Sequence, residues 1–332
     1  MRPSRSSTGL FIFFLALAAT RPAGAQTTGT VEGGAFLLLP VGARATALGQ
    51  AAAAEGSSTE ALFWNPAGLS SLPRAELALH HYTNFFGNGD AVVVAVPSAS
   101  FGTFAASVYV VDYGDFENTV GGPGGGPEPV GRFTARNVAL AAGYSTDIVA
   151  GIGAGLVYKL VQFRIDCTGQ CVNVASQVGT THAVDLGVQY VLPTAVRIVI
   201  GATVRNVGFK LQVNNQAQAD PLPTRIQVGV SCGLLRPPPG SDRFDLRLMA
   251  DVQGVVGRGE LAPVTLLGAE SGAGDALRLR AGYAFLDSSA RGPSIGVGLR
   301  FGSLALDLAR VFYEAEGLGE KEPMHVSFRV IF

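Results

Sequence analysis

From residue 74 onward, apolar side chains alternate with small or polar ones, and this two-residue period limits what the chain can fold into. In the segment 277–285, Leu277, Leu279 and Tyr283 occupy one set of alternate positions, and Arg278 and Arg280 occupy the other. Successive side chains of a β-strand point to opposite faces, so the pattern predicts strands with one apolar face. About fourteen segments of membrane-crossing length follow it, at 74–84, 90–97, 101–113, 132–145, 149–165, 180–192, 196–209, 222–234, 243–253, 261–271, 275–286, 294–302, 303–313 and 323–332.

The composition excludes several other classes of protein. Hydrophobic residues make up 48% of the chain and charged residues only 15%, whereas a soluble domain has about 25% charged residues. Intrinsic disorder is excluded because the apolar content is too high and the charge too low. A helical membrane protein is excluded because no run of about 18 apolar residues follows the N-terminal region. The net charge of −1 and the lack of a basic patch argue against a nucleic-acid partner.

Two all-β architectures fit the alternation, a soluble β-sandwich and a transmembrane antiparallel β-barrel. A sandwich has a polar outer face rich in Lys, Glu and Thr, because that face meets bulk water. Here the second face carries mainly Gly, Ala and Ser with a few charges, which suits an enclosed lumen. We therefore predict an all-β transmembrane barrel of about 14 strands over residues 74–332, with both ends of the barrel chain in the periplasm.

The connections between the predicted strands provide an independent test of this interpretation. Outer-membrane barrels have short periplasmic turns and long external loops, so long and short connections should alternate along the chain. The sequence predicts long connections at 84–89, 114–131, 166–179 and 210–221, and tight ones at 98–100, 145–147, 193–195 and 271–274. Only the connection at 236–242 departs from this alternation.

Residues 1–25 have the three-part pattern of a secretory signal peptide. Arg2 and Arg5 form a basic start, the apolar run 10–19 follows, and the small residues of Ala23-Gly24-Ala25 mark a cleavage site. The alternative, a membrane-anchoring helix, requires a longer apolar run. We expect a mature chain that begins at Gln26 and is located in the bacterial outer membrane, in contact with its lipids.

The charged residues of the predicted strands fall on the face opposite the apolar one. Charges are costly against lipid, so we expect these side chains to face the lumen. Opposite charges there can pair across strands and hold the lumen rigid, or they can form an electrostatic lining that selects a solute, and the sequence leaves both roles open. The predicted lumen charges are Arg197, Arg205, Arg225, Arg247, Arg278, Arg280, Arg300, Asp185, Asp245, Asp251 and Asp307.

The C-terminus and the cysteines fit the same location. The chain ends on Phe332, with Phe328 on the same predicted lipid face, and this resembles the terminal signal that the barrel assembly machinery reads in outer-membrane proteins. Cys167 and Cys171 lie in the third predicted external loop, where an oxidising compartment permits a small disulfide. Cys232 is left over and is predicted to be a small apolar residue on the lipid face.

No motif in the sequence indicates catalysis, a cofactor or a bound metal. His80 and His81 are adjacent on a predicted strand, so their side chains point to opposite faces and do not share one ion. The three cysteines have no histidine pair nearby that would complete a zinc site. No Gly-x-Ser-x-Gly elbow and no Ser/His/Asp set stands out. We therefore predict that the protein is not an enzyme.

Residues 26–73 do not alternate and form a separate predicted segment. A short helix is expected at 59–63, capped by Ser57 or Ser58 and ended by Pro66. This segment is too small and apolar to stand alone, so we predict that it packs inside the barrel as a plug. Its key residues are Trp64, Asn65, Pro66, Ala67 and Gly68.

The N-terminal segment also resembles a known family. Gly42-Ala43-Arg44-Ala45, Gly49, the alanine-rich stretch after it and Trp64-Asn65-Pro66-Ala67-Gly68-Leu69 are similar to the N-terminus of PorV/PorQ-type proteins, within the FadL-like outer-membrane superfamily. The resemblance implies a barrel of fourteen strands closed by an N-terminal hatch, with Asn65, Pro66 and Ala67 as the hatch motif. These residues either hold the plug in place or take part in gating.

Three functions follow from this resemblance and remain open on the sequence. The first is a passive channel for hydrophobic small molecules, gated by the hatch. The second is a component or cargo-handling scaffold of a type IX-like protein secretion system, with secretion-system proteins as partners. The third is a structural barrel with no transported ligand.

Overall fold

The computed structural model describes residues 32–84, 87–122, 125–171, 176–194, 196–212, 219–235, 244–256, 263–274, 276–286, 291–312 and 323–332. The predicted signal peptide and the predicted connection 236–242 lie outside these residues. Four short helices precede the strands: η1 (Ala35–Leu38), α1 (Ala43–Ala47), α2 (Ala61–Trp64) and η2 (Pro66–Ser71). None of the described helices has the length and apolarity that crossing a membrane requires.

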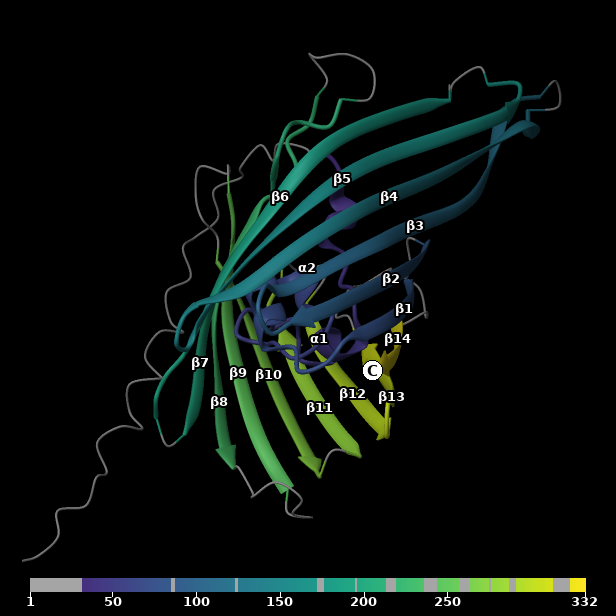
Figure 1. The fold of residues 1–332 in the computed structure, drawn as a ribbon. Helices are drawn as coiled ribbons and strands as arrows, with labels where there is room; N and C mark the ends of the chain where they lie inside the picture. Colours follow the sequence, from purple (N-terminus) through teal and green to yellow (C-terminus); the bar gives the residue numbers. More distant parts are fainter. Residues whose placement is uncertain are drawn as a thin grey trace, which may run out of the picture. The chain divides into compact units, whose positions relative to one another are not determined.

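The strands form one closed antiparallel barrel (Figure 1). They are β1 (Glu76–Asn84), β2 (Gly87–Ser98), β3 (Gly102–Gly121), β4 (Pro127–Val149), β5 (Ile152–Gly169), β6 (Gln177–Val191), β7 (Arg197–Gly208), β8 (Arg225–Leu235), β9 (Phe244–Val255), β10 (Val264–Ala273), β11 (Leu277–Ala284), β12 (Gly292–Phe301), β13 (Leu304–Val311) and β14 (Met324–Ile331).

Closure of the barrel distinguishes it from a sandwich. Each strand pairs with the next along the chain, and β14 pairs back onto β1, for example at Leu79↔Phe328. None of the described strands is left with an unpaired edge, which is the arrangement that a chain surrounded by lipid requires. The predicted fold class, an all-β barrel of 14 strands, is confirmed.

The alternation seen in the sequence separates the two surfaces of the barrel wall. Along β13, exposed Leu304, Leu306 and Leu308 alternate with buried Ala305 and Asp307. The same division runs around the described strands and leaves large apolar side chains on the outer surface. These include Leu79, Val94, Phe104, Leu140, Leu156, Leu186, Ile200, Val228, Leu248, Leu279, Ile295 and Phe328.

The two ends of the barrel differ in their connections. At one end, which we call the turn end, β1 begins, β14 ends, and residues 99–101, 150–151 and 302–303 join neighbouring strands. At the opposite end, which we call the loop end, longer segments such as 209–224 join β7 to β8. Short connections therefore gather at one end of the barrel and longer ones at the other, as predicted, although several boundaries differ.

Three predicted connections are wrong at the loop end. The stretch 114–131 was expected as a loop because it is rich in Gly and Pro, but β3 continues to Gly121 and β4 starts at Pro127. The two segments pair with each other at Phe116↔Phe133, so the ladder satisfies their backbone groups. The expected loop at 166–179 is also shortened, because β5 reaches Gly169 and β6 starts at Gln177. The first connection is tight, since β1 ends at Asn84 and β2 begins at Gly87.

One predicted turn at the other end is also wrong. Residues 145–147 lie within β4, and the turn falls at 150–151 instead. The ladder between β4 and β5 continues past the expected turn through Ser145↔Gly155 and Asp147↔Gly153. As a result β3, β4 and β5 contain 20, 23 and 18 residues, well beyond the roughly 10 residues that a bilayer requires.

Candidate functional site: the hatch and the barrel lumen

Residues 32–72, which we call the hatch, lie inside the ring of strands (Figure 1). Each of the four hatch helices has only four to six residues. Helices this short are not stable in isolation, so contacts with the barrel wall must hold them in place. Helix α2 starts at Ala61 without a side-chain cap, and the predicted cap by Ser57 or Ser58 is wrong. Ser57 instead has a positive φ of 66° in the turn before the helix.

A series of glycines on the lumen face of the wall seats the hatch. A Cβ built on Gly268 stands 2.7 Å from the carbonyl oxygen of Leu48, and one on Gly296 stands 2.5 Å from the Ala47 side chain. Both distances are shorter than ordinary van der Waals contact, so any larger residue must displace the hatch. The small lumen residues noted in the sequence therefore give the hatch its close fit. The seat consists of Gly143, Gly155, Gly187, Gly201, Gly268, Gly282 and Gly296.

Asn65 joins three parts of the molecule with one buried side chain. Its amide donates to the carbonyl of Ala53 in the hatch at 2.6 Å. It also lies 3.3 Å and 3.4 Å from the wall carbonyls of Val188 and Ala202. Its carbonyl accepts the backbone N–H of Ala67 at 3.1 Å and so caps η2, where Pro66 stands at the first position. The Asn-Pro-Ala motif thus fixes both the start of η2 and its contact with the wall.

The two aromatic residues before this motif also contact the lumen. Trp64 is buried and donates its indole N–H to the carbonyl of Val41 at 2.9 Å. The guanidinium of Arg205 lies over its ring at 4.9 Å from the centroid. Phe63 makes edge contacts with His80 and Tyr109 of the wall.

A network of ion pairs connects α1 to the wall. Arg44 pairs with Glu55 of the hatch and, at 3.1 Å, with Glu270 on β10. Glu270 also accepts from Arg247 at 2.5 Å and from Arg280 at 2.6 Å. Burial by itself lowers the pKa of the Arg44 guanidinium, but the carboxylates of Glu270 and Glu55 outweigh it, and the pKa lies above its usual value. Glu270 is the centre of the network because its buried carboxylate pairs with three guanidinium groups.

Glu60 is a buried carboxyl group of the hatch itself. Its two oxygens accept the backbone N–H groups of Arg44 and Ala45 at 3.2 Å and 2.9 Å. Burial raises its pKa above the ordinary value, with a further contribution from the negative charge of Asp307. These contacts stabilise the start of α1, where the backbone N–H groups have no partner within the helix.

The predicted lumen charges all lie on the inner surface of the wall, in two groups. Near the loop end of the hatch, Asp185 pairs with Lys159 at 2.5 Å and accepts the Asn206 N–H, while Asp251 accepts the Ala53 N–H. Arg205 and Arg225 lie in the same half, and Arg225 pairs with Glu32 at 2.8 Å. The remaining predicted charges line a cavity toward the turn end: Arg197, Arg247, Arg278, Arg280, Arg300, Asp245 and Asp307.

The loop-end half of the lumen contains an apolar cluster beside these charged residues. Phe36 and Leu39 of the hatch pack with Tyr82, Tyr109 and Phe163 of the wall. The cavity between hatch and wall in this region measures only about 30 Å³, with Phe63, Trp64 and Arg205 among its lining. This volume admits a few water molecules at most, so an aromatic molecule does not fit between hatch and wall at this point.

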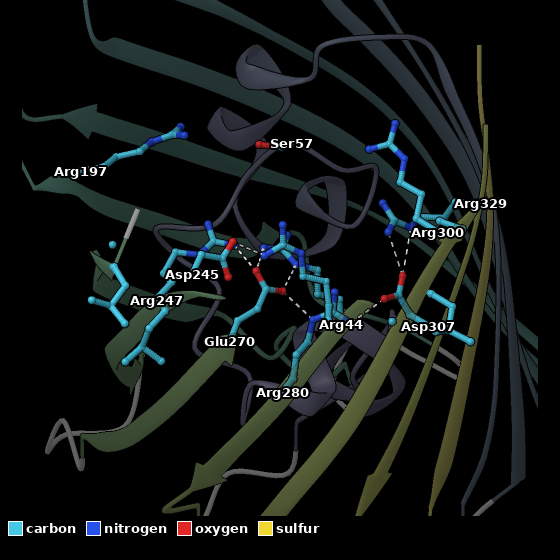
Figure 2. Close-up of a pocket in the computed structure, with 17 residues that line it drawn as sticks. Arg44, Ser57, Arg197, Asp245, Arg247, Glu270, Arg280, Arg300, Asp307 and Arg329 are labelled. Atoms are coloured by element: carbon cyan, nitrogen blue, oxygen red, sulfur yellow. Dashed lines mark hydrogen bonds and ion pairs between the residues drawn. The ribbon is translucent and has the colours of Figure 1, made fainter. Parts of the chain in front are cut away.

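The turn-end half contains a much larger cavity of about 450 Å³, which we call the vestibule (Figure 2). Arg44 and Ser57 contribute to it from the hatch, and the turn-end portions of β7 to β14 supply the rest. The charged side chains of the turn-end half therefore line an open cavity, whereas those of the loop-end half, such as Lys159, Arg205 and Arg225, are buried beside an apolar cluster.

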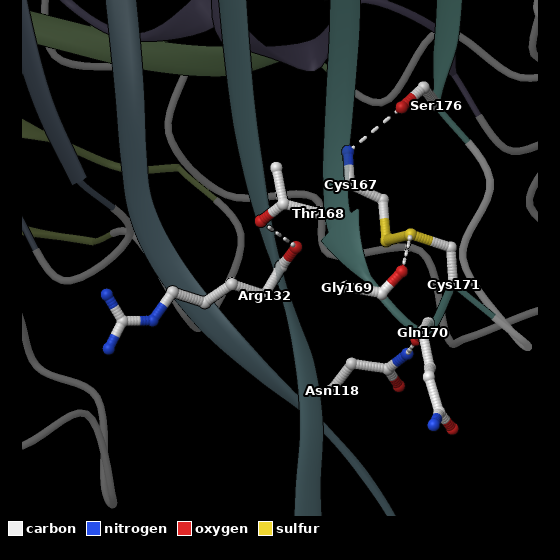
Figure 3. The surroundings of a disulfide bond; sticks show 8 residues. All are labelled: Asn118, Arg132, Cys167, Thr168, Gly169, Gln170, Cys171 and Ser176. Atoms are coloured by element: carbon white, nitrogen blue, oxygen red, sulfur yellow. Dashed lines mark hydrogen bonds between the residues drawn. A yellow bond between two sulfur atoms is a disulfide. The ribbon is translucent and has the colours of Figure 1, made fainter.

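The cysteines and histidines take the following positions. Cys167 at the end of β5 is bonded to Cys171, with their Cα atoms 6.1 Å apart, and the Cys167 N–H donates to Ser176 (Figure 3). Cys232 is half-buried on the outward face of β8. His80 faces the lumen and contacts the Ser327 hydroxyl at 2.7 Å, whereas His81 is exposed. Within the described residues, no three metal-ligating side chains come together.

At the C-terminus, Phe328 and Phe332 both point outward. The backbone N–H of Phe332 donates to the carbonyl of Ala75, beside the start of β1. Both rings are exposed on the outer surface at the turn end. The structure thus leaves the terminal aromatic residues accessible from outside the barrel.

Sequence reasoning missed several residues that hold the site together. Glu76, Lys159 and Glu270 all occupy inward positions of their strands, so the alternation used for the other lumen charges would have found them. Glu55 and Glu60 carry no such signal, because the hatch has no regular period. Gln189 and Gln227, which donate to hatch carbonyls at 2.7–3.0 Å, lie on inward positions as well.

Comparisons with known proteins show which solved structures share this fold. No protein-family model matches the chain, and no curated protein matches it. Among solved structures, the toluene transporter TbuX of Ralstonia pickettii aligns with a TM-score of 0.55 at 13% identity, over 90% of this chain and 100% of its own. The toluene transporter TodX of Pseudomonas putida aligns with a TM-score of 0.58 at 15% identity, over 88% and 98%. A FadL homologue of Pseudomonas aeruginosa aligns with a TM-score of 0.51 at 13% identity, over 89% and 99%.

Two of these neighbours are toluene transporters and one is a FadL homologue, and the likeness extends over nearly the full length of both chains. At 13–15% identity it establishes the fold and leaves function to the site itself. The predicted FadL-like architecture is therefore confirmed at the level of fold.

Proposed function

We propose that this protein is an outer-membrane channel through which hydrophobic small molecules pass without an energy source when the hatch rearranges. The closed wall and the apolar outer surface support a position in the outer membrane. In that position the turn end faces the periplasm and the loop end faces the exterior. The exposed Phe332 at the turn end fits folding by the barrel assembly machinery.

The observation that carries the proposal is the apolar lumen surface on the outer side of the hatch. Phe36, Tyr82 and Tyr109 form a buried cluster there, and partly buried Leu39 and Phe163 pack against it, so a molecule entering from the loop end contacts these side chains once the hatch moves. Such a surface favours an apolar solute and gives a strongly hydrated one no replacement for its water. The two toluene transporters with the same fold support hydrocarbons as the solute class to test.

Passage requires movement, because the cavity next to Trp64 is too small for an aromatic ring. We expect this movement to begin at the first residues of the hatch. Glu32 is held by its ion pair with Arg225, and Gly33 donates its N–H to the carbonyl of Pro221. These are partly buried contacts near the loop end, whereas Asn65 and Arg44 are held on several sides deeper in the lumen. We therefore infer that residues 32–39 move before the rest of the hatch.

Uptake by intact cells tests this function. Labelled toluene is supplied to a Gram-negative host that lacks such a channel, with and without expression of the full chain, and its entry is compared with that of a labelled disaccharide. The proposal expects expression to speed toluene entry and leave disaccharide entry unchanged. Equal toluene entry with and without the protein would contradict it.

A second candidate function, a scaffold for protein secretion, is favoured by the long strands at the loop end. β3 and β4 continue well past the length that a bilayer needs, and Phe116 and Phe133 stack on this extension at 5.1 Å between ring centroids. Phe116 is exposed, so the extension offers a surface to a protein partner. Deletion of residues 114–131 separates the two functions. A channel keeps toluene uptake after this deletion, whereas a secretion component loses export of its cargo.

A further inference from the structure

The arginines that line the vestibule outnumber the carboxylates that pair with them. Seven arginines line it, and the described carboxylates that pair with them number five: Glu55, Glu76, Asp245, Glu270 and Asp307. Among the described residues, this leaves an excess of two positive charges in a cavity of about 450 Å³. That volume lies in the range of small-molecule sites, roughly 300–1,000 Å³.

The excess is carried by two arginines at the mouth of the vestibule. Arg300 on β12 donates its Nε–H only to the carbonyl of Gly302, at 3.2 Å. Arg197 on β7 pairs with Gly233 of β8 through its backbone, and its side chain makes no hydrogen bond or ion pair with any described residue. Figure 2 shows that the dashed contacts gather around Glu270 and Asp307 and that none reaches Arg197. Both side chains thus keep guanidinium donors for a ligand.

The paired arginines supply further donors on the inner side of the cavity. Arg329 pairs with Asp307 at 2.9 Å. Arg44 of the hatch also lines the vestibule, and it pairs with Glu270. A guanidinium has five N–H groups in a planar fork. The contacts of Arg44 with Glu55, Glu270 and the Gly56 carbonyl use four of them, and those of Arg329 with Asp307 and Glu76 use three, so each keeps at least one donor. The carboxylates in turn hold these arginines in fixed positions, which lowers the entropy cost of binding a ligand.

Several guanidinium forks around one cavity define the chemistry of the ligand. Arginine binds phosphate and carboxylate oxygens in a bidentate manner, and a ligand with several such groups can contact both the mouth and the inner side. We propose that the vestibule binds a small multivalent oxyanion, with phosphate or carboxylate groups held by Arg197 and Arg300 at the mouth and by Arg44 of the hatch. A bound anion of this kind links the hatch to the wall from the turn end.

Calorimetry on the full chain in a nonionic detergent tests the site, with inorganic pyrophosphate as the probe and citrate as the carboxylate counterpart. We expect saturable binding of at least one of them. The double variant Arg197→Gln/Arg300→Gln should weaken it about tenfold or more, because it removes two guanidinium groups that can make charged hydrogen bonds with the ligand. Arg164→Gln, which removes the same charge from the loop-end pair with Asp166, should bind as the native protein does.

Two outcomes overturn the proposal. One is the absence of saturable binding of both probes to the native protein, and the other is unchanged affinity in the double variant. Gel mobility of the unheated variants shows whether the barrel has formed. The variant Arg300→Lys adds a further readout, because it keeps the charge and loses the fork, so it should bind more weakly than the native protein and more tightly than Arg300→Gln.

The oxyanion has two conceivable sources, a lipid headgroup or a free solute. Native mass spectrometry of protein purified from outer membranes distinguishes them. A bound phospholipid that pyrophosphate displaces identifies a headgroup as the natural occupant. Binding of pyrophosphate to lipid-free protein, with no phospholipid displaced, identifies a free solute.

Discussion

Gly187 on β6 lies directly against the side chain of Asn65, so closely that a Cβ on Gly187 would overlap the Asn65 carbonyl oxygen. The same asparagine hydrogen-bonds to Ala53 in the hatch and lies near the carbonyls of Val188 and Ala202. This contact is the closest approach between a hatch side chain and the glycines that seat the hatch. Trp64 stands next to this contact and is the single tryptophan of the chain, so its fluorescence reports on the position of the hatch.

Gly187→Val should displace the hatch from its seat. The added side chain has no room beside Asn65, and overpacking of this kind costs about 1–3 kcal/mol. We expect Trp64 to become more accessible to acrylamide and the barrel to leak small polar dyes. The matched control is Gly233→Ala, where the nearest atom to a new Cβ is 3.8 Å away. Equal Trp64 quenching in the two variants would argue against the glycine seat.

Asn65→Ala should loosen the hatch without any steric conflict. It removes the amide that donates to Ala53 and the acceptor for the Ala67 N–H, and each buried group left without a partner costs about 1–3 kcal/mol. Hydrogen exchange of residues 61–72 should accelerate, while exchange in β11 stays slow. Asn88→Ala, at an exposed position on β2, serves as the control. Native exchange rates in Asn65→Ala would show that the motif does not hold the hatch.

Glu270→Gln should destabilise the protein more than any surface charge change. It takes the negative charge away from Arg44, Arg247 and Arg280 in a buried network, and breaking such a pair costs about 3–5 kcal/mol. Urea titration in detergent micelles measures the loss. Glu117→Gln, at an exposed position on β3, should change the unfolding midpoint very little. The prediction is wrong if the two variants unfold at the same urea concentration.

Glu60 should make the seating of the hatch dependent on pH. Its pKa is raised in the folded protein above the ordinary value near 4.5. Between the two values the folded state binds more protons than the unfolded state, so the free energy of unfolding decreases as pH rises through this window. We expect Trp64 quenching to increase from about pH 4 upward. Glu60→Gln should remove this dependence, and an identical pH profile in that variant would exclude Glu60 as its source.

The sequence predicted the wall better than the hatch, for a physical reason. An apolar outer surface and an enclosed lumen impose the alternation that separates Leu279 from Arg280, so a local pattern predicted the outward and inward faces. Strand ends are less well determined, because pairing such as Phe116↔Phe133 turned a Gly/Pro-rich stretch into strand. The contacts of Asn65 with Ala202 and of Arg44 with Glu270 join residues more than 130 positions apart. No local pattern predicts such contacts.

The central claim is that the hatch must leave its seat for a molecule to cross the barrel. A Cβ on Gly153 stands 2.5 Å from Ser70 Oγ of η2, so Ser70→Cys/Gly153→Cys allows a disulfide between hatch and wall after a small adjustment. Both cysteines are introduced into a Cys232→Ser protein, which lacks the remaining free thiol. The Cys232→Ser protein without the new pair, treated with the same oxidant and reductant, shows any effect of the Cys167–Cys171 bond.

Labelled toluene uptake by cells expressing this locked variant is the most direct measurement of the claim. The account predicts that uptake falls to the level of cells without the protein while the disulfide is intact, and that a reductant restores it. Uptake that continues unchanged through the oxidised variant would contradict the claim.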